Sequence, residues 1–210
     1  MIGVEIIAIG NELLAGDVLD TNSHWLCGRL TGLGGGVRRA TMVGDDPIAI
    51  VDALRGALAR GARLIVTTGG LGPTEDDRTL ESVAAALGLG LTEHPLALEQ
   101  VAAKYTALAR QGAVASAEMT PARAKMARLP IGAEPLANGV GAAPGVLLRT
   151  GEQIIVCLPG VPAELRDIFE GSLRPTLAAL LGQGAYRAWA LTVACGDESV
   201  WAPILARAGA

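Results

Sequence analysis

Residues 67–77, Thr-Thr-Gly-Gly-Leu-Gly-Pro-Thr-Glu-Asp-Asp, place three glycines next to three consecutive acids. The apolar run at residues 64–68 predicts a strand, so the glycines follow directly after its end. Glycines at such a position allow a positive φ and a close backbone approach, and their N–H groups can surround a phosphate. The acids repel a phosphate unless a cation lies between them, and carboxylates are the ligands that Mg²⁺ prefers. The segment therefore predicts a metal-assisted site for a phosphorylated, nucleotide-like ligand.

An alternative is that the acids only cap the helix predicted at residues 79–87. Thr74 and Asp77 have the spacing of a capping box, in which each side chain binds a backbone N–H of the other residue. A cap needs one carboxylate and this loop carries three, so the ligand site is the favoured interpretation.

Two further acid-bearing loops follow predicted strands. Apolar runs at residues 4–9, 37–43 and 64–68 alternate with helix-like segments at intervals of about 30 residues, a pattern typical of a parallel sheet covered on both faces. The loops after these strands are residues 11–20, 44–46 and 69–77. Since ligands bind where the carboxyl ends of parallel strands meet, we expect Glu12, Asp45 and Asp77 to surround one cleft.

These acids suggest roles in metal-assisted hydrolysis. Asp45, Asp76 and Asp77 are the candidate metal ligands, and Glu12 or Glu75 is the candidate for orienting or deprotonating the attacking water. Asp45 also has an alternative interpretation, because it lies near the start of the helix that Pro47 begins and can serve as its N-cap.

The remainder of the chain predicts a helical excursion and a mixed sheet. Residues 93–128 contain a long helical segment that starts after His94-Pro95 and a short second helix at residues 121–126. Two apolar runs at residues 146–149 and 153–158 predict a hairpin, so the sheet is expected to be mixed. A helix is expected at residues 163–181, and a last strand at residues 187–193.

Composition limits the classes of function. The chain has 210 residues and a net charge of −4, and no block rich in lysine or arginine suggests a nucleic-acid partner. Its three cysteines, Cys27, Cys157 and Cys195, form neither a disulfide framework nor a metal-binding pair, as expected in a reducing compartment. No run of about 18 apolar residues is present. We expect a cytoplasmic, soluble protein without a membrane partner.

Several motifs, taken together in their order, resemble a known family. They are Ile9-Gly10-Asn11-Glu12-Leu13-Leu14-Ala15-Gly16, Asp20-Thr21-Asn22-Ser23, Val43-Gly44-Asp45-Asp46, residues 67–77, residues 139–145 and Leu158-Pro159-Gly160-Val161-Pro162. This combination resembles the N-terminal domain of the CinA (competence/damage-inducible) family, which is similar to the MoaB/Mog-type molybdopterin-binding fold. The resemblance covers residues 4–180.

The resemblance implies a three-layer α/β/α domain with a mostly parallel, mixed sheet at residues 1–182. Residues 183–210 resemble the shortened start of the family's inter-domain region. The implied activity is metal-dependent hydrolysis of ADP-ribose or a related nucleotide pyrophosphate. Longer family members carry a nicotinamide-mononucleotide deamidase domain, which we do not expect in a chain ending at Ala210. Proteins of this fold assemble as dimers or trimers, so a homo-oligomer is expected.

The resemblance also assigns roles to residues. Asp77 takes the place of the acid that serves metal-dependent chemistry on the pterin phosphate in Mog-type proteins, and Asp45 takes the second acidic position. The residues after Asp77 are Arg78-Thr79-Leu80-Glu81 instead of Thr-Pro-Glu, which makes molybdopterin a less favoured ligand. The expected ligand-binding residues are Gly10, Asn11, Asn22, Thr68, Gly69, Gly70, Leu71, Gly72, Pro73, Thr74, Gly141, Pro159 and Gly160.

Three functions therefore remain open. The first is a metal-dependent pyrophosphatase, and the second is a domain that binds a molybdopterin or nucleotide without turnover. The third is a partner subunit of a separate nicotinamide-mononucleotide deamidase.

Overall fold

A six-stranded mixed sheet forms the centre of the computed structural model, which describes residues 2–182, 194 and 197–208. The strands are β1 (Ile2–Ile9), β2 (Gly35–Val43), β3 (Leu64–Thr68), β6 (Glu134–Leu136), β7 (Gly145–Thr150) and β8 (Gln153–Leu158). Their order is β2-β1-β3-β8-β7-β6, with β2, β1, β3 and β8 parallel and the other two antiparallel to their neighbours. The predicted mostly parallel sheet and its β7–β8 hairpin are confirmed.

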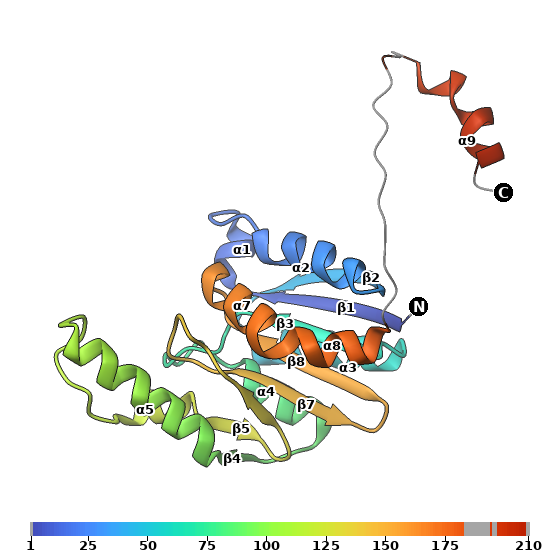
Figure 1. Cartoon of the computed structure of the whole chain (residues 1–210). Helices are drawn as coiled ribbons and strands as arrows, with labels where there is room; N and C mark the ends of the chain where they lie inside the picture. Colours follow the sequence, from blue (N-terminus) through green and yellow to red (C-terminus); the bar gives the residue numbers. More distant parts are fainter. Residues whose placement is uncertain (1, 183–193, 195–196, 209–210) are drawn as a thin grey trace.

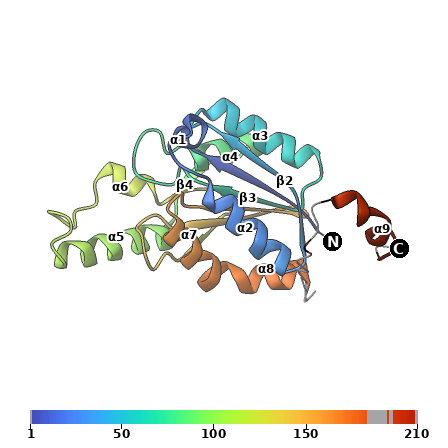
Figure 2. The ribbon, with the colours of Figure 1, turned by 90° about the horizontal axis from the view of Figure 1, so that it is seen from above.

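Helices cover both faces of this sheet, as Figures 1 and 2 show. On one face lie α2 (Thr21–Gly32), α7 (Pro162–Ile168) and α8 (Arg174–Leu181), and on the other lie α3 (Pro47–Ala59) and α4 (Thr79–Leu87). Strand β1 supplies both cores by alternation, since Val4 and Ile6 pack with the first group while Ile7 and Ile9 pack with the second. The three-layer α/β/α architecture is confirmed.

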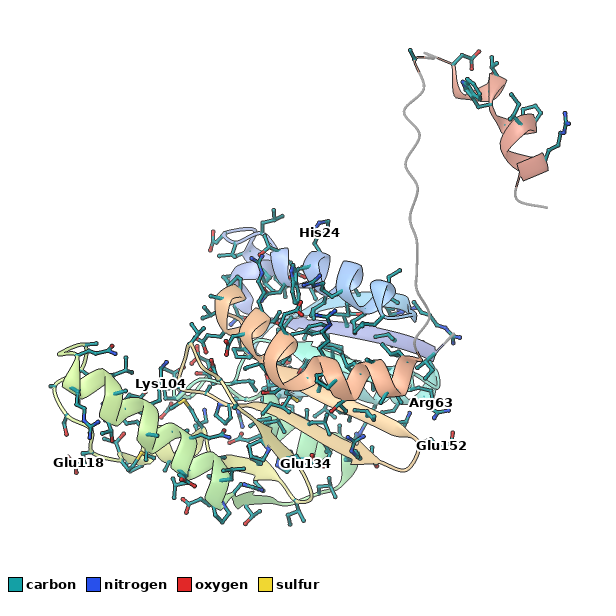
Figure 3. All side chains as sticks on the ribbon, in the orientation of Figure 1. His24, Arg63, Lys104, Glu118, Glu134 and Glu152 are labelled. Carbon is teal, nitrogen blue, oxygen red and sulfur yellow. The ribbon has the colours of Figure 1, made fainter. Side chains whose placement is uncertain are left out.

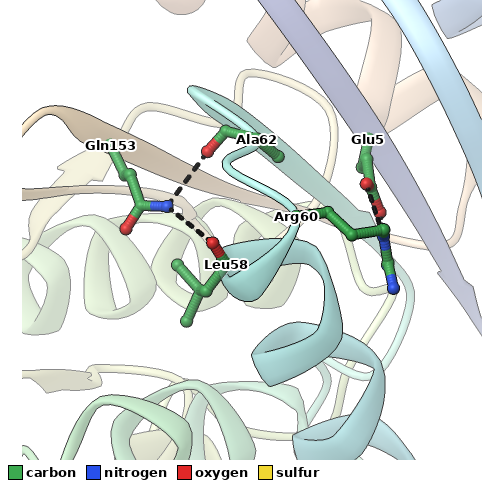
Figure 4. Close-up of polar contacts among 5 residues, drawn as sticks. All are labelled: Glu5, Leu58, Arg60, Ala62 and Gln153. Carbon is green, nitrogen blue, oxygen red and sulfur yellow. Dashed lines mark hydrogen bonds and ion pairs between the residues drawn. The ribbon is translucent and has the colours of Figure 1, made fainter.

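One charged side chain interrupts the apolar run of β1. Glu5 is only 4% exposed, and both of its carboxylate oxygens accept from Arg60 at the end of α3, at 2.8 Å from Nε and 2.6 Å from Nη2. The hydrogen bonds from Arg60 are the main reason that the pKa of Glu5 lies below its ordinary value. Nearby, the Gln153 side chain donates to the carbonyls of Leu58 and Ala62, which ties β8 to the end of α3 (Figure 4).

Two predicted elements differ in the structure. The segment expected as a loop at residues 11–20 begins with a short helix, α1 (Asn11–Ala15), which ends where Gly16 adopts a φ of 78°. The helix expected at residues 163–181 is interrupted by a π-helical turn, η1 (Phe169–Leu173), between α7 and α8. Pro175 explains this change, because it lacks the N–H that a continuous helix needs and its ring displaces the preceding turn.

The helical excursion is attached by a small sheet that the sequence did not predict. Strands β4 (Leu91–Glu93) and β5 (Arg128–Pro130) pair in antiparallel fashion at its two ends. Between them lie α5 (Pro95–Arg110) and α6 (Pro121–Lys125), which agree with the predicted helices. Figure 1 shows α5 beside the main sheet and next to this two-stranded sheet.

Near the carboxyl terminus, the described elements are a 3₁₀ turn, η2 (Glu198–Val200), and α9 (Ala202–Ala208). The strand predicted at residues 187–193 lies outside the described residues, and the division of the chain at residue 182 stays a prediction. In the part of the chain that the structure describes, no helix has the length and apolar character needed to cross a membrane.

Candidate functional site

A cleft of about 620 Å³ lies where the loops after β1, β2, β3 and β8 converge. Of the predicted site residues, those that line it are Gly10, Glu12, Asp45, Gly69, Gly70, Leu71, Gly72, Pro73, Asp76, Asp77, Pro159 and Gly160. The fold therefore brings Glu12, Asp45 and Asp77 to one cleft, as expected from the position of their loops. The volume lies in the range of sites that hold a nucleotide-sized ligand.

Six predicted site residues do not line this cleft: Asn11, Asn22, Thr68, Thr74, Glu75 and Gly141. Glu75 lines a separate groove together with Arg78 and Glu81. Conversely, the sequence-based prediction did not assign Tyr105, Met126, Ala142, Ala143, Val161, Pro162 and Glu164 to the site, and all of them line the cleft.

Residues 69–72 form the glycine loop. Its first two residues must be glycine because the backbone packs closely against neighbouring atoms. Gly69 has a φ of 106°, and a Cβ built on it would lie 2.1 Å from the carbonyl oxygen of Ile9. Gly70 has a φ of 67°, and its Cβ would lie 2.3 Å from Oγ1 of Thr79. Only glycine accommodates both the positive φ and this approach.

The same loop offers unused hydrogen-bond donors. Within the described residues, the N–H groups of Gly70, Leu71 and Gly72 have no acceptor in the protein, whereas the Gly69 N–H donates to the Leu158 carbonyl at 3.0 Å. Three consecutive free N–H groups at the wall of a cleft are suited to an anionic ligand.

Glycines also make room for carboxylates around the cleft. A Cβ built on Gly10 would lie 2.4 Å from Oε1 of Glu12, and one built on Gly72 would lie 2.5 Å from Oδ2 of Asp77. The missing side chains allow each carboxylate to lie directly against the backbone. These glycines therefore position acids, in addition to any role they have toward a ligand.

Asp77 closes a turn outside the following helix. Its Oδ2 accepts from the Thr74 N–H at 2.9 Å and from the Thr74 hydroxyl at 2.5 Å. Helix α4 begins only at Thr79, after an N-cap residue, Arg78, that makes no capping side-chain bond. The capping-box alternative is therefore wrong, because the Thr74–Asp77 pair stabilises the loop and not the helix.

Asp45 links the first two loops. Its Oδ2 accepts from the Asn11 N–H at 2.9 Å, and its own N–H donates to Oδ1 of Asn11 at 3.2 Å. The N-cap of α3 is instead Asp46, whose carboxylate accepts from the Ile48 N–H at 3.1 Å. The N-cap alternative for Asp45 is therefore wrong, and Asn11 acts through its bonds to Asp45.

Asn22 and Thr68 hold the turns together beneath the cleft. The Asn22 side-chain amide donates to Oγ1 of Thr68 at 3.0 Å and to the Gly160 carbonyl at 2.7 Å. The Thr68 hydroxyl donates to the Pro159 carbonyl at 3.0 Å. This network joins α2, β3 and the turn after β8, so both residues fix the wall of the cleft in the present structure.

Glu164 is an acid that the sequence-based prediction missed. Its Oε2 accepts from the Asn138 side-chain amide at 2.7 Å, and a Cβ on Gly141 would lie 1.9 Å from the same oxygen. The Asn138 amide also donates to the Ala143 carbonyl, while its side-chain oxygen accepts from the N–H groups of Val140 and Gly141. Gly141 thus affects the cleft by leaving room for the Glu164 carboxylate. The two residues are too far apart in the sequence for this contact to be recognised from their spacing.

Charge in the cleft is strongly one-sided. Glu12, Asp45, Asp76, Asp77 and Glu164 line it, and no lysine or arginine occurs among its described lining residues. The pKa of Asp76 lies below its ordinary value, chiefly through hydrogen bonding with Thr74 and then its own backbone N–H, with a smaller effect of Lys125. Asp76 is therefore held in the charged form.

The predicted metal ligands do not form a metal centre on their own. Across the residues that the structure describes, no three His, Cys, Asp or Glu side chains are grouped closely enough to hold a metal ion. Asp45 and Asp77 each present a carboxylate to the same cleft, which fits an ion that a phosphorylated ligand also binds.

Fold and cleft together define an α/β/α protein of the MoaB/Mog type. A solved structure titled "protein CinA with unknown function" from Thermoplasma acidophilum is 36% identical, with a TM-score of 0.75 over 83% of this chain and 97% of that one. MoaB from Thermus thermophilus, a molybdopterin biosynthesis enzyme, is 24% identical and shares the fold, with a TM-score of 0.55 over 89% of this chain and all of that one.

A protein-family model described as "Probable molybdopterin binding domain" matches residues 5–179, and the chain belongs to this family as a CinA-like protein. A "CinA-like protein" of Anaeromyxobacter sp. (strain Fw109-5) is 46% identical over 180 residues, which are 86% of this chain. The match spans only 42% of that relative's length. "Protein PH0439" of Pyrococcus horikoshii is 40% identical over 201 residues, 96% of this chain and 77% of the relative.

Proposed function

We propose that this protein is a metal-dependent pyrophosphatase that hydrolyses ADP-ribose or a related nucleotide pyrophosphate. The observation that carries the proposal is a cleft lined by a loop with three unused N–H donors and by five carboxylates, with no lysine or arginine among its described lining residues. The N–H groups favour a phosphate, whereas the carboxylates repel it. A divalent cation between the carboxylates and the phosphate would offset their repulsion. The description of the family as molybdopterin-binding also supports a phosphorylated heterocyclic ligand.

Two carboxylates would share the cation with the ligand. Mg²⁺ is usually bound by one or two carboxylates together with substrate phosphates, and Asp45 and Asp77 are held by hydrogen bonds in a position to serve. When bound, the ion would neutralise charge on the pyrophosphate. Asp76, fixed in its charged form, would add to the negative potential that attracts the cation.

Glu164 and Glu12 are the proposed candidates for orienting the attacking water. Each carboxylate lines the cleft and lies against a glycine. Glu164 is the better held of the two, because its Oε2 accepts from Asn138, while its other oxygen has no partner among the residues that the structure describes. Glu75 is no longer favoured for this role, since it lies in another groove.

Turnover of ADP-ribose with Mg²⁺, and with EDTA in its place, tests the proposal. We expect Asp45→Asn and Asp77→Asn each to lower kcat/KM by at least about a hundredfold, the scale of losing a positioned catalytic group. Asp52→Asn is the matched control, since Asp52 is an exposed acid on α3 outside the cleft. Full metal-dependent turnover in both site variants would show that the site is elsewhere.

A binding domain without turnover is the second candidate, favoured by the description of the family as molybdopterin-binding. This candidate would be favoured if the wild-type protein binds the ligand but does not hydrolyse it with any of the metals tested. Two partner proposals go with either candidate: assembly as a dimer or trimer, and association with a separate nicotinamide-mononucleotide deamidase. Light scattering after size exclusion tests the first, and copurification with deamidase activity tests the second.

A further inference from the structure

The cleft has an apolar side that the phosphate and carboxylate chemistry does not use. Its lining there consists of Tyr105, Met126, Ala142 and Ala143. Met126 and Ala143 belong to the same buried core as Leu71, and Tyr105 and Ala142 pack against that core. This apolar part of the lining therefore has a rigid base and lies next to the glycine loop and Glu164.

Tyr105 is the single aromatic residue among the described residues that line the cleft. It lies on α5 and is half-buried. The guanidinium carbon of Arg123 lies 3.8 Å from the centroid of its ring, so one face of the ring is covered. Tyr105 therefore lines the cleft with a ring that Arg123 supports.

Arg123 is itself fixed in place. Its Nη1 donates to the carbonyls of Ser116 and Glu118, at 2.8 and 2.7 Å. Its backbone N–H donates to the Thr120 hydroxyl, which caps α6. Because these hydrogen bonds fix Arg123 within the protein, we assign it the role of supporting the tyrosine ring and not that of binding a ligand phosphate.

The neighbouring Lys104 connects α5 to a loop that contributes residues to the cleft. Its Nζ donates to the Gly139 carbonyl at 2.9 Å, and it is labelled on α5 in Figure 3. Gly139 belongs to the loop that contributes Ala142 and Ala143 to the cleft, and its N–H donates to Oδ2 of Asp167 on α7. The tyrosine and the alanines facing the cleft are thus tied together before any ligand arrives.

We propose that Tyr105, held by Arg123, is a specificity-determining residue that stacks a planar heteroaromatic ring of the ligand, with Met126, Ala142 and Ala143 as the rest of the ring subsite. The inference rests on the proposed function, because it assigns a binding subsite to the ring of the same ligand whose phosphates bind at the glycine loop. Preorganisation matters here, since a ring that is already fixed loses little conformational entropy when the ligand binds. Stacking on an aromatic side chain tolerates different heterocycles, so the subsite selects for a ring rather than for one base.

The test compares ligands with and without a ring. Dissociation constants are measured by calorimetry, with Mg²⁺ present, for nicotinamide mononucleotide and for ADP-ribose at a temperature where turnover is negligible. Ribose 5-phosphate serves as the ring-free probe. The variants are Tyr105→Leu, which keeps an apolar side chain, and Tyr105→Phe, which keeps the ring. Thermal denaturation of each variant verifies that it is folded.

We expect Tyr105→Leu to weaken binding of a ring-bearing probe by on the order of tenfold, while its affinity for ribose 5-phosphate changes less than about twofold. Tyr105→Phe should bind like the wild type. Equal losses for ring-bearing and ring-free probes would show a purely structural role and overturn the proposal, as would wild-type-like affinities in Tyr105→Leu or no binding of either ring-bearing probe to the wild type. Nicotinamide mononucleotide has no pyrophosphate, so selective loss of its binding supports the ring subsite even if ADP-ribose is never hydrolysed.

Discussion

Substitution of Gly69 by alanine tests whether the fold itself requires a glycine at this position, independently of any ligand. The φ of 106° at Gly69 disfavours an L-residue by about 1–2 kcal/mol. The added Cβ would also lie 2.1 Å from the carbonyl oxygen of Ile9 at the end of β1, which is backbone and cannot rotate away. Overpacking of this kind adds about 1–3 kcal/mol. We therefore expect Gly69→Ala to lower the free energy of unfolding by about 3 kcal/mol.

Gly88→Ala is the matched control for this prediction. Gly88 ends α4 with a φ of 68°, but no atom lies within 4 Å of the position of a Cβ. Its replacement should therefore carry only the conformational penalty, about 1 kcal/mol. The difference of about 2 kcal/mol between the two variants isolates the clash with β1.

Urea denaturation followed by far-UV circular dichroism measures both variants. A lower midpoint with an unchanged m-value reports the loss of stability. If Gly69→Ala is no less stable than Gly88→Ala, then the close packing of the glycine loop on β1 is not rigid, and the reasoning from backbone approach fails.

Two further predictions concern a carboxylate at the cleft and one inside the sheet. Gly141→Ala should displace the Glu164 carboxylate, because the added Cβ would lie 1.9 Å from its Oε2. We expect kcat to fall by at least about tenfold while the thermal midpoint stays near that of the wild type. An unchanged kcat would exclude Glu164 from the reaction. Glu5 has a lowered pKa through Arg60, so its ion pair stabilises the fold above the ordinary pKa of 4.5 and is lost as the pH falls through the lower folded value. Glu5→Gln should therefore be less stable than the wild type at pH 7, and in urea melts the gap should narrow below about pH 4.5; a constant gap would contradict the linkage.

The parallel core of the sheet was predictable because its signals are local. Each of β1, β2 and β3 is a short run rich in apolar or β-branched residues, and each following helix has one apolar stripe and a glycine at or near its end. Right-handed connections between such units leave few topologies. The position of the cleft followed from the same pattern, since loops that follow parallel strands gather at one edge.

Other elements depended on contacts between distant segments. Strands β4 and β5 are three residues each, too short for a periodic signal, and they form because the two ends of the excursion pair with each other. The π-helical turn η1 carries no pattern of its own and follows from Pro175 in a helix whose apolar face remains packed on the sheet.

The sequence by itself determined which chemical groups this protein has available. The glycines and acids of residues 67–77, with Glu12 and Asp45, mark the strand ends because backbone conformation and charge are properties of short segments. Only the tertiary structure decided the partners of those groups: Asp45 binds Asn11, Asn138 holds Glu164, and Tyr105 comes to the cleft from the excursion. The physical reason is that hydrogen bonds and packing require proximity in space, which chain folding creates between residues that spacing in the sequence cannot relate.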